Sequence, residues 1–153
     1  MGAEEGRGPG PEGLDPERFV LAQQGTYAQA LEELRRGRKT THWMWFVFPQ
    51  LKGLGRSPMS ERYAIPSLEA ARLYLDHPVL GPRLRECTAV VANLEGRTAH
   101  QVFGSPDDRK FHSSITLFHL ARPAETVFAN ALATYFQDQP DGATLALLGR
   151  DSG

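Results

Sequence analysis

Apolar residues recur along most of the chain at steps of three and four positions, which is the spacing of amphipathic helices. Val127, Ala131 and Tyr135, for example, would lie on one side of a single helix. Strict alternation of apolar and polar positions, the pattern of a half-buried strand, occurs nowhere in the sequence. The spacing and its stop signals predict helices over residues 15–25, 27–36, 67–77, 79–95, 105–121, 123–136 and 141–148.

Several of these helices have recognisable starts. Residues 105–108, Ser-Pro-Asp-Asp, place a serine at the expected N-cap, a proline at the first helical position and a carboxylate three residues after the cap. Asp15, Ser67 and Asp141 are the expected caps of the helices that they precede, and Pro123 is expected to open the helix after it.

Two segments are harder to interpret. Residues 43–49 form a continuous apolar run, and periodicity cannot distinguish a buried helix from a buried strand there. Residues 51–66 contain two glycines and two prolines and are predicted to form a long ordered loop. We therefore predict an all-α fold, a compact single domain of about seven or eight short helices with one long loop. It would span residues 14–149, between a disordered tail at 1–13 and a C-terminal tail at 150–153.

The charge and composition of the chain disfavour or exclude several classes of protein function. The 153 residues carry 17 bases and 18 acids, so the net charge of −1 disfavours a protein that coats nucleic acid. That balance is an average: seven acids and two bases precede residue 35, whereas residues 35–62 hold seven bases and one acid. A single cysteine excludes an intrachain disulfide and a multi-cysteine zinc site. With no apolar stretch long enough for a membrane span and no secretory signal, the cytoplasm is the expected location.

The first candidate cluster lies in the basic segment and contains both tryptophans of the chain. Aromatic faces beside basic side chains can stack a base and neutralise a phosphate. The alternative is that the apolar run beginning at Trp43 is simply core, with His42 at its polar border. The candidate residues here are Lys39, His42, Trp43, Trp45 and Gln50.

A second cluster follows at the glycine loop, residues 53–57, whose backbone N–H groups could cradle an anion. Arg56 would add a cation, while Ser60 and Tyr63 would extend the polar set. A plain turn is the competing interpretation, because the loop completes neither the Rossmann nor the P-loop pattern.

The third cluster belongs to the helix predicted over 105–121. It combines Asp108, Lys110, Ser113 and Thr116 with His112 on one short helix that also has an apolar side. Capping and the helix dipole would explain one of its two adjacent aspartates, but not both. The five histidines show no paired metal-ligand spacing, so we expect no metal site and no cofactor.

Taken together, the segments HWMWFVFPQLKGLG, SERYAI, HPVLGPRL, FGSPDDRK and SSITLF resemble the bacterial domain-of-unknown-function family numbered 1810, over about residues 15–148. The resemblance implies a mainly helical cytoplasmic domain and no established activity. Thr41 and His112 depart from, or lie outside, the family pattern. The motif positions that match it are Lys39, His42, Trp43, Trp45, Gln50, Ser60, Tyr63, Asp108, Lys110, Ser113 and Thr116. The layout is also similar, by fold class and by a late Ser-Pro-Asp element, to small helical N-glycosidases that act on ADP-ribosylated guanosine and riboflavin-pathway intermediates.

We accordingly predict binding of a small anionic, nucleotide-like or ADP-ribose-like ligand and, by analogy with those glycosidases, hydrolysis of an N-glycosidic bond. His42 and Asp108 would be catalytic. The ligand-binding residues would be Lys39, Trp43, Trp45, Gln50, Arg56, Ser60, Tyr63, Lys110, Ser113 and Thr116. The alternative is a non-catalytic protein-interaction module in which the HWMWF segment is core. The sequence leaves the substrate, the partner and the oligomeric state open.

Overall fold

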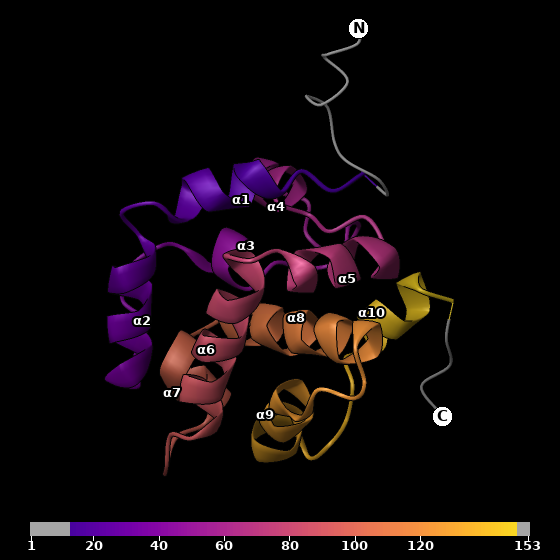
Figure 1. The fold of residues 1–153 in the computed structure, drawn as a ribbon. Coiled ribbons are helices and arrows are strands. Elements are labelled where there is room, and N and C mark those ends of the chain that lie inside the picture. The colour runs from indigo at the N-terminus through magenta and orange to yellow at the C-terminus, as the bar shows by residue number, and fades with distance from the viewer. Residues whose placement is uncertain (1–12, 150–153) are drawn as a thin grey trace, which may run out of the picture.

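The helix α8 (Asp107–Ala121) is the element around which the other helices pack. Six consecutive residues, 113–118, are buried, so this helix is covered on all sides rather than along one stripe. In the computed structural model, which describes residues 13–149, α8 crosses the middle of the molecule, and α5, α7, α9 and α10 pack directly against it (Figure 1). The two predicted tails lie, apart from Gly13, outside the described residues.

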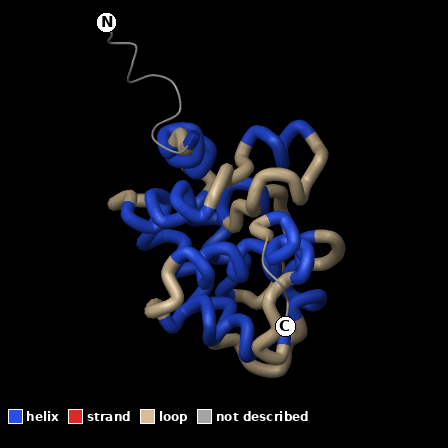
Figure 2. Tube along the Cα trace, turned by 90° about the vertical axis from the view of Figure 1, so that its right-hand side faces the viewer, coloured by secondary structure: helices blue, strands red, loops and turns tan. Residues whose placement is uncertain are grey.

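The described part of the chain contains ten helices. Figure 2 shows helices and loops in this part of the chain and no strand. An all-α fold is therefore confirmed, with two helices beyond the seven or eight predicted. The other nine helices are α1 (Pro16–Gln23), α2 (Tyr27–Arg35), α3 (Met44–Val47), α4 (Pro58–Arg62), α5 (Leu68–Asp76), α6 (Leu80–Ala92), α7 (Ala99–Phe103), α9 (Thr126–Phe136) and α10 (Gly142–Leu147).

The two unexpected helices, α4 and α7, are five residues long and owe their starts to local capping. The side chain of Ser57 accepts a hydrogen bond from the backbone N–H of Ser60 at 3.1 Å. Thr98 and Gln101 form a capping box, in which each side chain accepts from the other residue's backbone N–H. The predicted loop 51–66 thus contains a helix.

Three of the predicted helix starts need correction. Ser105 is not the N-cap of α8: the helix begins at Asp107, and the carbonyl of Gly104 accepts from the N–H of Asp108 at 2.8 Å. The N-cap position of α1 is Asp15, but its side chain pairs with Arg18 rather than capping the backbone. The helix α9 starts at Thr126, not at Pro123.

The residue that precedes α9, Glu125, is paired with Arg85 of α6. The extended backbone at Glu125 lets its carboxylate accept two 2.7 Å hydrogen bonds from the Arg85 guanidinium. The caps Ser67 and Asp141 are as predicted, since each side chain accepts from a backbone N–H three residues later.

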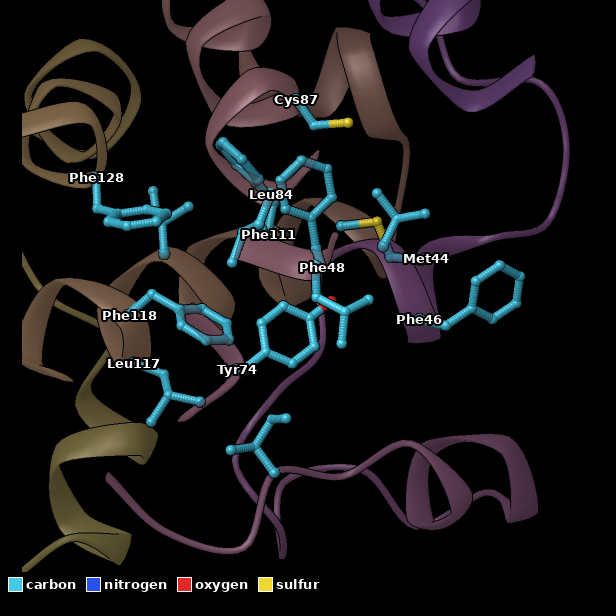
Figure 3. Close-up of a cluster of buried hydrophobic side chains, with 14 of the residues drawn as sticks. Met44, Phe46, Phe48, Tyr74, Leu84, Cys87, Phe111, Leu117, Phe118 and Phe128 are labelled. Carbon is cyan, nitrogen blue, oxygen red and sulfur yellow. The ribbon is translucent and has the colours of Figure 1, made fainter. Parts of the chain in front are cut away.

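Aromatic side chains fill the core between α3, α5, α7 and α8 (Figure 3). The ring of Phe48 meets that of Phe111 edge-on, with centroids 5.1 Å apart, and Phe111 stacks on Phe103 at 4.6 Å. Tyr74 meets Phe118 at 5.3 Å. The ambiguous run 43–49 therefore forms the short helix α3 and its flanks, and most of it lies in the core.

Replacing Phe111 by alanine tests the central position of α8. The ring is 0% exposed, so we expect Phe111→Ala to lower the free energy of unfolding by about 3–5 kcal/mol through lost burial and the resulting cavity. Urea denaturation measures this change. Leu21→Ala is the matched control: Leu21 is 62% exposed, and its loss should cost no more than about 0.5 kcal/mol. Equal effects of the two variants would contradict this description of the core.

Candidate functional site

The clearest candidate site is a cavity of about 380 Å³ that we call the lysine pocket. One wall is the segment 39–45, which comprises the end of the connection from α2 and the first two residues of α3. The other is formed by Phe103, residues 105–107 and Lys110, where α7 gives way to α8. A backbone hydrogen bond of 2.7 Å from the N–H of Lys39 to the carbonyl of Val102 joins the two walls. Segments some 60 residues apart in the sequence thus share one hollow.

Two ammonium groups share one carboxylate in this pocket. The Nζ of Lys39 lies 2.8 Å from Oδ2 of Asp107, and the Nζ of Lys110 lies 3.8 Å from Oδ1 of the same residue. The Lys39 side chain is only 7% exposed, and its Nζ also donates to the carbonyl of Thr41 at 2.6 Å. With two positive charges against one negative charge, these three side chains leave an excess of positive charge.

Aromatic rings lie against both lysines. Lys110 Nζ is 5.5 Å from the ring centre of Trp45, and Lys39 Nζ is 5.0 Å from that of Trp43. Trp45 is half-buried and lines the cavity. Trp43 is 0% exposed, so its ring offers no face for the stacking proposed from sequence. His42 is exposed at the edge of the same wall.

The wall is held from behind by Glu33 of α2, a buried residue whose importance the sequence did not reveal. Its carboxylate accepts hydrogen bonds from the backbone N–H groups of Thr40 and Thr41 at 2.8 and 3.1 Å. The Thr41 hydroxyl and the Trp43 indole N–H donate at 2.6 and 2.9 Å. Gln29, one turn earlier in α2, adds a fifth bond at 2.8 Å.

These bonds decide the protonation state of Glu33. Burial alone would raise the pKa of the carboxyl group. The hydrogen bonds from Thr41, Gln29, Thr40 and Trp43 outweigh burial and hold the pKa well below its ordinary value. The carboxylate therefore stays ionised without a cation beside it: within residues 13–149, no ion pair includes Glu33.

Asp107, rather than Asp108, lies in the pocket. The Asp108 carboxylate points instead toward His100, with 3.2 Å between Oδ2 and Nδ1, and its Oδ1 accepts from the N–H of Arg109. Helical spacing could have distinguished Asp107 from Asp108 in the sequence. Asp107 is three residues from Lys110 and shares a helix face with it, whereas Asp108 is two residues away and does not share that face.

Gln50 and Ser113 meet outside the pocket. The Gln50 amide donates to the Ser113 hydroxyl at 2.7 Å, which joins the segment after α3 to α8. Thr116 is buried and bridges α8 to α10, because its hydroxyl donates to the carbonyl of His112 and accepts from the N–H of Asp141. Tyr63 packs edge-on against the rings of Phe19 and Phe46 in the core.

Arg56 in the glycine loop and Ser60 beside it lie outside the lysine pocket. Arg56 lines a cavity of about 560 Å³ together with Lys52 and Glu61. Ser60 lies against Gly55, where a Cβ would approach the serine hydroxyl to 2.5 Å. The structure therefore brings Lys39, His42, Trp45 and Lys110 together in one pocket, with the buried Trp43 in its wall. The other predicted residues lie elsewhere.

Residues 13–149 contain no group of three or more His, Cys, Asp or Glu side chains placed to hold a metal ion. None of the helices described is long and apolar enough to cross a membrane.

The depressed pKa of Glu33 predicts how stability changes with pH. Because the pKa is lower in the folded than in the unfolded chain, the stabilisation is complete above the ordinary value of 4.5 and is lost as the pH falls below it. We expect Glu33→Gln to cost about 2–4 kcal/mol at pH 7, since buried donors lose their acceptor. The difference from the parent protein should shrink in urea titrations below pH 4.5. A difference independent of pH would contradict an ionised Glu33.

Comparison with known proteins identifies the family of the chain but no activity for it. None of the curated proteins compared with the chain matches it. Among solved structures, the chain is similar to the conserved hypothetical protein Rv1873 from Mycobacterium tuberculosis, with 53% identity, a TM-score of 0.86, and coverage of 88% of this chain and 96% of that chain. The family model described as "Protein of unknown function (DUF1810)" matches residues 13–148, so the chain belongs to the DUF1810 family, as its motifs indicated.

Proposed function

We propose that the lysine pocket binds a small phosphorylated, nucleotide-like ligand. The observation that carries the proposal is the convergence of Lys39 and Lys110 on Asp107 in a cavity of about 380 Å³ beside a half-buried tryptophan. Small-molecule sites are typically concave and combine apolar walls with a few converging polar groups. The pocket meets this description.

The lysines would hold the phosphate. An ammonium group has three N–H donors, and Asp107 takes one from each lysine at most. Lys39 spends a second donor on the carbonyl of Thr41, so at least one donor of Lys39 and two of Lys110 remain for an anion. A phosphate at this point would add charge-assisted hydrogen bonds without displacing Asp107.

Trp45 would contact the ring of the ligand, since it is the indole with exposed surface in this pocket. Trp43 would act only through the position of its neighbours. Four other predicted residues would support the pocket from outside, through packing and hydrogen bonds between helices and loops. They are Gln50, Ser113, Thr116 and Tyr63.

The chemistry that fits best is hydrolysis of an N-glycosidic bond, with Asp107 taking the role first assigned to Asp108. A fixed carboxylate stabilises the positive charge that develops on the sugar as its C–N bond breaks. His42 at the rim would give a proton to the leaving nitrogen and regain one from the water that adds to the sugar carbon. Substrate and water thus yield the free nitrogen base and the phosphorylated sugar, and the protein ends unchanged.

One observation favours the rival role as a protein-interaction module. Trp43, Met44 and Phe46 are buried, so the HWMWF segment is largely core, as that role requires. However, the same segment presents His42 and Trp45 to the lysine pocket. Ligand binding separates the two roles, because the module requires none.

Binding is tested with adenosine monophosphate as the probe, by calorimetry at low salt. We expect saturable one-to-one binding, and we expect Lys39→Ala or Lys110→Ala to weaken it about tenfold or more, as loss of a hydrogen bond to a charged group implies. Lys52→Ala removes the same charge from the glycine loop, outside the pocket, and should leave the affinity unchanged. If all three variants weakened binding equally, the loss of affinity would follow from net charge alone, and this would contradict binding in the lysine pocket.

Hydrolysis is tested by measuring release of free base from nucleoside monophosphates and release of guanosine from ADP-ribosylated guanosine. We expect Asp107→Asn to lower kcat by at least about a hundredfold, the usual effect of losing one preorganised charge, while phosphate binding survives. Asp108→Asn is the matched control and should retain activity. Activity lost in Asp108→Asn and kept in Asp107→Asn would reverse the assignment, and a parent protein that binds without turnover would limit the function to binding.

A further inference from the structure

We infer that Glu33 is the positioning residue of the lysine pocket: a buried charge that fixes the ligand-binding wall without touching the ligand. The inference rests on the proposed function only for its ligand measurement. Its geometric part concerns residues 40–43 of the wall and can be tested with no ligand present.

Four of the five hydrogen bonds to Glu33 come from the wall. Oε1 accepts from the N–H of Thr40, the N–H of Thr41 and the indole of Trp43, while Oε2 accepts from the Thr41 hydroxyl. The donors come from residues seven, eight and ten positions further along the chain. One side chain therefore determines the course of the whole wall.

The five donors around Glu33 require a carboxylate at this position rather than the neutral amide of a glutamine. All five contacts are with donors, and an ionised carboxylate offers only acceptors. A glutamine at this position would have one acceptor oxygen and would turn an NH₂ group toward donors. The wall therefore requires the charge of Glu33 as well as its shape.

Two links connect this charge to the binding lysine. The Lys39 Nζ donates to the carbonyl of Thr41 at 2.6 Å, and Thr41 itself donates twice to Glu33. The same Nζ lies 5.0 Å from the centre of the Trp43 ring, whose indole N–H is bound to Glu33. Both groups that place the Lys39 ammonium opposite Asp107 are thus anchored to the one carboxylate.

Amide hydrogen exchange by NMR tests the geometric part in the free, full-length protein. In Glu33→Gln we expect the amides of Thr40 and Thr41 to exchange at least tenfold faster than in the parent, while the amides of α6 and α9 keep their protection. The Trp43 indole resonance should also shift, since its acceptor changes. Gln29→Ala is the control, because Gln29 binds Glu33 from α2 and makes no bond to the wall.

The second variant, Thr41→Val, removes the hydroxyl donor alone and should loosen the wall in the same direction. It decides the question by itself if Glu33→Gln does not fold. Unchanged protection of the wall in the folded variants, or equal loss in the wall and in α6 and α9, would overturn the inference, because Glu33 would then be merely one residue of the core.

Ligand binding separates this inference from the proposed function. With adenosine monophosphate as the probe, we expect Glu33→Gln to weaken binding at least tenfold and Gln29→Ala to leave it unchanged. A loosened wall with unchanged affinity would overturn the positioning role and leave the pocket in place. A parent protein that fails to bind the probe would overturn the proposed function, and the exchange experiment would still decide the role of Glu33 in the wall.

Discussion

The carboxylate of Glu33 is the interaction on which the architecture of the candidate site depends. Burying a charge without a counter-ion is costly unless hydrogen bonds replace the lost water, and here five donors do so. Because four of those donors belong to residues 40–43, the hydrogen bonds to the buried charge hold the chain between α2 and α3 in place. That arrangement puts Trp43 into the core and leaves Lys39 and His42 on the cavity side.

The pocket that results has an unusual division of charge. The buried anion lies behind the wall, while the wall's own lysine pairs across the cavity with Asp107 at the start of α8. Lys110, one turn into the same helix, completes the set. The acids and bases that nearly cancel over the whole chain are therefore separated locally, and the excess positive charge lies beside Trp45 in a space sized for a small molecule.

Sequence patterns predicted the fold class and most helices, because spacing, caps and glycine stops act locally. The patterns did not predict α4 and α7, because five residues are too few to show periodicity. The capping box formed by Thr98 and Gln101 could, however, have been recognised in the sequence. The residues of the candidate site were harder to predict than the helices. Lys39, His42, Trp45 and Lys110 were found from residue type, and helix spacing could have favoured Asp107 over Asp108. Glu33 could not be found, since a glutamate on an amphipathic helix reads as solvent-facing until the loop that covers it is known.

The most direct test of the lysine pocket is an NMR titration of the isotope-labelled protein with adenosine monophosphate. If the pocket is the binding site, the amides of residues 39–45 and 103–110 and the Trp45 indole will shift together and saturate at one equivalent. Shifts centred on residues 52–61, which include the glycine loop and most of α4, or no saturable shift at all, would contradict it.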